Sequence, residues 1–291
     1  MLATSFDGQW AIRRRGREVA LYALAGPLAA PKKKLMLPDE TDALVWVGPP
    51  TVLARVSNAH APVPTRVELI GASDLAPVAK LDLDAKFSLA GVTGPRLVLV
   101  GPDVQGALTK VVVVRTAGTG LGAQPLDVNG VPVEHVVGLG SNQLLFVLRK
   151  DAMQIFDGTT SRSLGKAGLP IPPPPRTLGH ALGHAWAIHA STPDIFVYRM
   201  SDGRPFRHAV GAPIEQVISH PGSPVIVIVT PRGPVRLHCQ AHSLTLIECP
   251  WTAGSDLALV PGATADDVSL IGLAPDADVP WRVSVGKPSL T

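Results

Sequence analysis

The chain has 291 residues, enough for one large all-β domain or two ordinary ones, and its 46% apolar and 17% charged residues exclude a disordered chain. The formal net charge is +3, and no apolar run approaches the roughly 18 to 20 residues that a membrane-spanning helix needs. The first residues contain no charged segment followed by an apolar one, so no secretory signal is predicted.

Proline and glycine divide the chain into many short elements. There are 29 prolines and 28 glycines, spread along the chain rather than bunched. They interrupt every long window in which apolar residues could recur at the spacing of a helix. Short β-strands separated by turns are therefore predicted throughout.

The first predicted strands form a hairpin. Trp10–Arg13 leads into a turn at residues 14–16, and Glu18–Tyr22 returns from it. Alternating apolar and polar residues around a glycine turn are typical of a β-hairpin. A third strand is predicted at Lys34–Leu37.

Six further groups of short strands follow at regular intervals. Their first strands begin near residues 43, 87, 134, 177, 214 and 256, which gives a period in the low forties. Four strands in each repeat of this length are typical of the blades of a β-propeller. The predicted blades are residues 8–40, 42–84, 86–130, 132–168, 176–211, 213–251 and 255–288.

Several predicted strands are apolar at almost every position, including Leu144–Leu148 and Val225–Val229. A strand buried on one face alternates between apolar and polar residues, so these strands favour burial on both faces. A four-stranded sheet is buried in this way when a neighbouring sheet covers each of its faces. The sequence therefore predicts an all-β fold, a seven-bladed β-propeller of four-stranded antiparallel blades, formed as a single domain by residues 1–291.

The last blade contains only three predicted strands, at Asp256–Val260, Val268–Leu273 and Trp281–Val285. We predict that residues 2–6 complete this blade and close the ring. The alternative is that the same residues form the inner strand of the first blade, and the sequence leaves both possibilities open.

Parts of four predicted blades resemble the WD-type repeat. Residues 214–222 (I-x-x-V-x-x-H-P-G) are similar to its innermost strand and turn, and residues 195–203 (IFVYRMSDG) are similar to its third strand and exit turn. Residues 154–158 and 5–8 repeat parts of this pattern, although the chain contains no Trp-Asp dipeptide. The resemblance implies a divergent member of the WD-repeat-like β-propeller superfamily, with no specific subfamily and no functional residue carried over.

The densest group of histidines is His180, His184 and His189. On a hairpin that turns at residues 182–183, His180 lies opposite Ala185 and faces away from His184. His189 shares a face with His180 but lies about 13 Å away along the strand. Zinc ligands must converge to within about 2 Å of one point, so structural histidines are predicted here rather than a metal site.

Two other patterns were weighed as cofactor or metal sites. His238 and Cys239 are neighbours on a strand and face opposite ways, which argues against a site with His242. The glycine-rich residues 118–122 follow an apolar strand, as a dinucleotide-binding loop does, but no predicted helix follows them. A hairpin loop is the favoured interpretation, and no metal, cofactor or catalytic residue is predicted.

Positive charge is concentrated near the N-terminus. Residues 1–34 contain seven cations and two acids, whereas the rest of the chain contains 19 cations and 21 acids. Such a cluster can bind an acidic protein surface or phosphates. The tryptophans are scattered over different blades and form no stacking platform, so nucleic acid is the less favoured partner. The candidate partner-binding residues are Arg13, Arg14, Arg15, Arg17, Lys32, Lys33 and Lys34.

The sequence favours a non-catalytic scaffold or protein–protein interaction module in a bacterial multiprotein assembly. The two cysteines, Cys239 and Cys249, are predicted too far apart to pair, which favours a reducing cytoplasmic location. The proline-rich residues 169–176 are predicted to be a stiff connector between blades, or a ligand for a proline-recognition domain.

Two other functions remain open. One is an enzyme, a hydrolase or lyase with its site at the mouth of the propeller channel, for which the candidate residues are Glu134, His135, His180, Glu215 and His220. The other is binding of nucleic acid or an acidic partner through the basic N-terminal blade.

Overall fold

A computed structural model describes residues 1–48, 51–58, 64–117, 120–138, 143–148, 152–157, 163–166, 177–189, 193–265 and 267–286. The elements in these ranges are β-strands, which form six four-stranded sheets and one three-stranded sheet, all antiparallel. Within the same ranges, no helix has the length and apolar character needed to cross a lipid bilayer.

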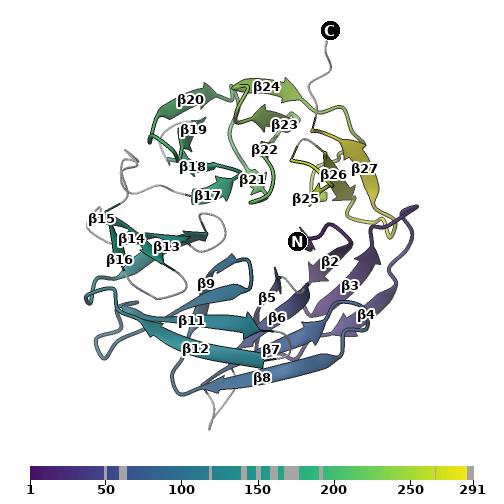
Figure 1. Cartoon of the computed structure of the whole chain (residues 1–291). Helices are drawn as coiled ribbons and strands as arrows, with labels where there is room; N and C mark the ends of the chain where they lie inside the picture. The colour runs from purple at the N-terminus through teal and green to yellow at the C-terminus, as the bar shows by residue number, and fades with distance from the viewer. Residues whose placement is uncertain are drawn as a thin grey trace. The chain divides into compact units, whose positions relative to one another are not determined.

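Each sheet is a meander in which strands that follow one another in sequence are neighbours in space (Figure 1). We number the sheets in chain order. Sheet 1 contains β1 (Leu2–Thr4), β2 (Trp10–Arg15), β3 (Glu18–Ala23) and β4 (Lys33–Met36). Sheet 2 contains β5 (Thr41–Val47), β6 (Val52–Ser57), β7 (Thr65–Gly71) and β8 (Pro77–Leu83). Sheet 3 contains β9 (Ser88–Thr93), β10 (Arg96–Gly101), β11 (Lys110–Ala117) and β12 (Gly120–Leu126).

The remaining strands repeat this arrangement. Sheet 4 contains β13 (Val133–Gly138), β14 (Gln143–Leu148), β15 (Ala152–Asp157) and β16 (Ser163–Lys166). Sheet 5 contains β17 (Thr177–Ala181), β18 (His184–Ile188), β19 (Asp194–Arg199) and β20 (Pro205–Ala209). Sheet 6 contains β21 (Gln216–Ser219), β22 (Val225–Thr230), β23 (Gly233–His238) and β24 (Ser243–Leu246). Sheet 7 contains β25 (Asp256–Pro261), β26 (Val268–Leu273) and β27 (Trp281–Ser284).

The chain divides into two compact units, which we describe separately. The first unit comprises residues 1–15, 20–34 and 168–291, and the second comprises residues 16–19 and 35–167. Sheets 5, 6 and 7 and most of sheet 1 lie in the first unit, and sheets 2, 3 and 4 lie in the second.

The core of the first unit lies between successive sheets. All six residues of β22 are buried. Ile226 and Ile228 pack with sheet 5 residues such as Trp186, whereas Val225 and Val227 pack with sheet 7 residues such as Leu257. Since neighbouring residues of a strand point to opposite faces, one apolar strand joins two cores. This confirms the prediction that Val225–Val229 is buried on both faces.

The second unit is built in the same way around β10. Leu97 and Leu99 pack with residues of sheet 2, including Val67, whereas Val98 and Val100 pack with residues of sheet 4, including Phe156. Fully burying such a side chain contributes about 1.5 to 3 kcal/mol, so an apolar face of this kind stabilises the contact between sheets.

The structure corrects the prediction for the N-terminal strand. Residues 2–6 were expected to complete the last blade, but β1 pairs with β2 in sheet 1, with Leu2 opposite Arg13, which is the alternative that the sequence left open. The cause is the tight turn that follows β1, in which the Ser5 backbone N–H donates to the carbonyl of Trp10 at 2.9 Å. So short a connection keeps the two strands together, and sheet 7 has three strands among the described residues.

Within the first unit, β1 also lies beside the first strand of sheet 7. The Thr4 hydroxyl donates to the Leu259 carbonyl of β25, and Leu2 packs with Ala258 and Val260. Figure 1 shows the N-terminus next to β25 and β26.

The chain forms seven successive antiparallel meanders, and within each unit neighbouring meanders cover one another with apolar side chains, as the blades of a β-propeller do. The predicted fold class is confirmed: the chain is all-β and has the seven-bladed β-propeller fold. One blade shows three strands in the described residues rather than the predicted four.

Candidate functional site

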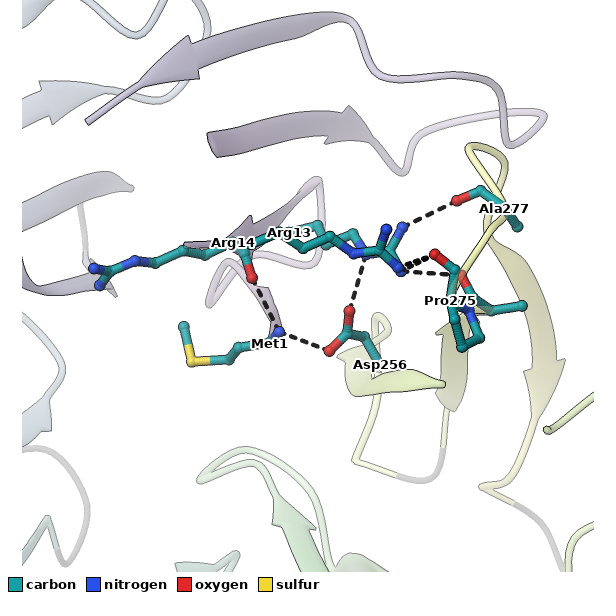
Figure 2. Close-up of polar contacts among 8 residues, drawn as sticks. Met1, Arg13, Arg14, Asp256, Pro275 and Ala277 are labelled. Carbon is teal, nitrogen blue, oxygen red and sulfur yellow. Dashed lines mark hydrogen bonds and ion pairs between the residues drawn. The ribbon is translucent and has the colours of Figure 1, made fainter. Parts of the chain in front are cut away.

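The predicted basic cluster begins at Arg13, which lies inside the first unit and not on its surface. The side chain is 5% exposed and follows the apolar pair Ala11 and Ile12 in β2. Its Nε donates to Asp256 Oδ2 at 2.9 Å, and its two terminal nitrogens donate to the carbonyls of Ala274, Pro275 and Ala277 at 2.9 to 3.3 Å (Figure 2). The guanidinium therefore joins sheet 1 to sheet 7.

Asp256 is shared between two cations, as Figure 2 shows. Its Oδ1 lies 2.6 Å from the ammonium of Met1, and that ammonium also donates to the carbonyl of Arg14 at 3.1 Å. Burial alone would raise the pKa of Asp256, but the hydrogen bonds from the ammonium and from Arg13 outweigh burial and lower it. This network holds β1 and β2 against β25.

Four of the other predicted cations in the first unit are exposed, and one is half-buried. Arg15 is exposed and donates to the carbonyl of Pro275, whereas Arg14 is half-buried. Lys32 lies over the ring of Trp10, with its Nζ 5.0 Å from the ring centroid. Lys33 and Lys34 are the first two residues of β4, and both are exposed.

Arg17 belongs to the second unit. Its Nη1 lies 2.6 Å from Asp39 Oδ1, and its Nε donates to the Leu37 carbonyl at 2.8 Å. Both ionic groups are more than half exposed, so this pair contributes little stability.

The histidines form no metal site among the described residues, where no group of three or more His, Cys, Asp or Glu side chains is placed to hold an ion. His180 lies opposite Ala185, and His184 lies opposite Ala181, so the two side chains point to opposite faces as predicted. Burial, together with a smaller effect of the charge on His184, lowers the pKa of His180 to about 4. Burial also lowers the pKa of His220 to about 4. The centroid of its ring lies 5.8 Å from the centroid of the Phe6 ring.

Other sequence predictions fall partly outside the described residues. Residues 118 and 119 and the proline-rich residues 169–176 lie outside them, as do the side chains of Glu134 and His135. Gly120–Gly122 belong to β12, which pairs with β11 as a hairpin and opens no helix. The hairpin interpretation of this glycine-rich segment is confirmed for these residues.

Sequence analysis missed a pocket of about 600 Å³ in the first unit. Three turns line it: the β17–β18 turn at Leu182-Gly183, the β19–β20 turn at Met200-Ser201, and the β23–β24 turn at Gln240–His242. His184 and Arg199 complete the wall. These residues come from turns of two sheets, so no single motif in the sequence joins them.

One lining residue of this pocket, His242, belongs to a stack of rings that continues beyond the lining residues. The rings of Phe206 and His242 are 3.7 Å apart with an interplanar angle of 27°, and His208 lies 5.7 Å from His242. The guanidinium carbons of Arg204 and Arg199 lie 5.2 and 5.9 Å from the Phe206 centroid, within the range of cation–π attraction.

Comparisons with known proteins identify the fold. No protein-family model matches the chain, and no curated protein matches it. Among solved structures, the chain is similar to the β-propeller domain of Myceliophteria thermophila Cps50 (Swd1), with a TM-score of 0.65, 12% identity, and coverage of 98% of this chain and 95% of that one.

Two further structures show the same likeness. One is BBS1N in complex with ARL6DN, with a TM-score of 0.56, 13% identity, and coverage of 84% of this chain and 77% of that one. The other is dihydro-heme d1 dehydrogenase NirN in complex with DHE, with a TM-score of 0.57, 16% identity, and coverage of 99% of this chain and 66% of that one. The fold is that of a β-propeller, and at these identities the likeness extends to the fold alone.

Proposed function

We propose that this chain is a non-catalytic interaction module that docks an acidic surface of a protein partner in a bacterial multiprotein assembly. The observation that carries the proposal is the exposure, within the first unit, of four cations of the N-terminal segment: Arg15, Lys32, Lys33 and Lys34. Outside residues 1–34 the chain has more acids than cations, so these side chains hold the surplus of positive charge.

Arg13 has no place in the proposed contact surface. Its guanidinium is 5% exposed and donates to groups of its own unit. The proposal therefore rests on the exposed cations, with Arg14 at their edge. The BBS1N structure, which contains ARL6DN, supports the proposal in that a propeller of similar fold is bound to another protein.

Two further parts of the proposal concern catalysis and location. Burial lowers the pKa of the candidate catalytic residues His180 and His220 to about 4, so at pH 7 neither holds the proton that a general acid must donate. This supports a non-catalytic role, and a tightly bound metal found by elemental analysis would instead favour an enzyme.

The free thiols of Cys239 and Cys249 support a cytoplasmic location.

The test compares two triple variants in an affinity purification. Lys32→Glu, Lys33→Glu and Lys34→Glu together reverse the proposed surface, and Lys80→Glu, Lys86→Glu and Lys110→Glu make the same change of charge at three exposed lysines elsewhere. We expect wild type and the second variant to recover a stoichiometric protein partner, and the first variant to recover about tenfold less of it.

Equal recovery by both variants would contradict the proposed surface. Recovery that nuclease treatment abolishes, with an affinity that falls steeply with salt, would instead indicate binding of nucleic acid.

A further inference from the structure

The pocket between the turns of sheets 5 and 6 differs from the surface proposed for partner docking. It uses none of the N-terminal cations, and its volume of about 600 Å³ lies within the range of about 300 to 1,000 Å³ that is common for small-ligand sites. Leu182 and Met200 give it apolar walls, and Arg199 and two histidines give it polar ones.

Strand pairing fixes the positions of the two polar residues at the base of the pocket. His184 lies directly opposite Arg199 in the antiparallel pair β18–β19, so their side chains point to the same face of sheet 5. This is the face from which Trp186 and Val197 pack against sheet 6. His184 and Arg199 therefore lie at the open end of the contact between the two sheets.

The guanidinium of Arg199 is held in a fixed orientation. Its Nε and Nη2 donate to the two carboxylate oxygens of Asp202 at 3.0 and 2.5 Å, and the Arg204 backbone N–H donates to the same carboxylate at 3.1 Å. A guanidinium has five N–H groups, so three remain after this fork is made. Because the side chain is 41% exposed, those donors are available to a ligand.

Near this wall, positive charge exceeds negative charge. The guanidinium of Arg199 pairs with Asp202, whereas Arg204 donates to that carboxylate through its backbone N–H and its guanidinium adds a second positive charge. Arg204 is exposed beside the ring of Phe206, which in turn stacks on His242. A ligand with a single negative charge next to a flat or apolar group matches both the charge and the stacked rings.

We propose that this pocket binds a carboxylate carried on an apolar or aromatic group. The carboxylate comes either from a small organic acid or from an acidic residue beside a hydrophobic one in a peptide. Arg199 binds the carboxylate through its remaining N–H groups, and the ring stack and Met200 receive the apolar part.

Binding is coupled to protonation of His242. The pKa of His242 is lowered by burial and then by the charges of His184, Arg199 and Arg204. Asp202 and His208 are the other titratable groups of the facing strand and turn. A bound carboxylate opposes the effect of the arginines and raises the pKa of His242, so binding takes up a proton and tightens as the pH falls.

The test follows histidine ring signals by NMR while three probes are added: phenylacetate, acetyl-Phe-Asp-amide and inorganic phosphate. We expect phenylacetate or the dipeptide to shift the signals of His242 and His184, with tighter binding at pH 6 than at pH 8. Tighter binding of phenylacetate assigns the pocket to small acids, and tighter binding of the dipeptide assigns it to peptides. Binding of phosphate alone, or of no probe, overturns the proposal.

Variants locate the site. Arg199→Gln weakens binding about tenfold or more, because a charge-assisted hydrogen bond is lost. His242→Asn removes the pH dependence, and asparagine tolerates the positive φ of 52° at this position. Arg232→Gln is the control, since Arg232 is exposed at the opposite end of sheet 6, in the β22–β23 turn.

Exposed Arg204→Gln is a second variant in case Arg199→Gln fails to fold, and it is expected to weaken binding in the same direction. Equal affinity of wild type, Arg199→Gln and Arg204→Gln overturns the proposal.

Discussion

Two polar side chains of the first unit, Arg13 and His180, are more than nine-tenths buried but differ in their hydrogen bonds. Arg13 donates to Asp256 and to three carbonyl groups. The Nδ1 atom of His180 has no hydrogen-bond partner among the described residues. Leaving a buried nitrogen unpaired costs about 1 to 3 kcal/mol. Burial also disfavours the protonated form of His180, so the stability of the folded state depends on pH at this residue.

We expect the free energy of unfolding to decrease as the pH falls from about 6.5 to about 4. The unfolded chain binds a proton at His180 near pH 6.5, whereas the folded chain binds it only near pH 4, because burial lowers the pKa. Between these values the unfolded state holds more protons, so the stability that is complete above pH 6.5 is lost on acidification, by up to about 3 kcal/mol for this residue.

Urea unfolding at pH 7.0 and pH 4.5 measures this loss. His180→Leu removes the titrating group, so its loss of stability between the two pH values is smaller than that of wild type. The free energy of unfolding of the variant still decreases with falling pH, because burial lowers the pKa of His220 in the same way. Identical losses for wild type and the variant would show that His180 is not the coupled group.

At the scale of elements, most predicted strands are found within a few residues of their expected limits. Val268–Leu273 begins and ends as predicted, and Asp256–Pro261 and Trp281–Ser284 each differ by one residue from the predicted end. Glycine or proline lies near the ends of these strands, so local sequence determines their limits. The partner of β1 depended on the geometry of one turn, which apolar pattern alone does not specify.

That turn depends on Gly8. Its φ is +66°, and a Cβ atom added there would meet the carbonyl oxygen of Pro261 and lie 3.2 Å from Val260 Cγ1. The Asp7 carboxylate accepts from the Ser5 hydroxyl at 2.6 Å and from the Gln9 backbone N–H at 3.0 Å, which holds the turn closed. The position therefore combines a left-handed backbone with close contact to β25.

Gly8→Ala is expected to destabilise the protein by about 3 kcal/mol or more, because left-handed strain and a collision with β25 add together. Gly16→Ala is the matched control: its φ is +56°, and a Cβ atom there meets nothing within 4 Å. Strain alone makes the control cost about 1 kcal/mol. Thermal unfolding of the two variants measures the difference in stability. If Gly8→Ala and Gly16→Ala lost the same stability, β1 would not lie against β25 as described.

At the scale of the whole molecule, the fold could be predicted because short strands separated by turn residues recur in the sequence of each blade. The candidate sites could not, because they depend on which side chains the blades bring together. Arg13 and Lys32 look alike in the sequence, but one is buried against Asp256 and the other is exposed over Trp10. The pocket at His184, Arg199 and His242 joins turns about 60 residues apart in the sequence, and no spacing rule connects them.

The hypothesis that residues 1–291 form one domain predicts a single cooperative unfolding transition. Sheet 1 takes residues from both compact units, since β3 begins at Glu18 in the second unit and continues from Ala20 in the first. Because a single strand, β3, belongs to both units, unfolding either unit interrupts that strand, and the two units are expected to lose structure together.

Hydrogen exchange measured by mass spectrometry in increasing urea tests this at β10 in the second unit and β22 in the first, both of which are fully buried. We expect their amides to become labelled at the same urea concentration, and Gly8→Ala to lower that concentration equally for both. Two separate midpoints, with only that of β22 shifted by Gly8→Ala, would show that the units fold independently and that the single-domain hypothesis is wrong.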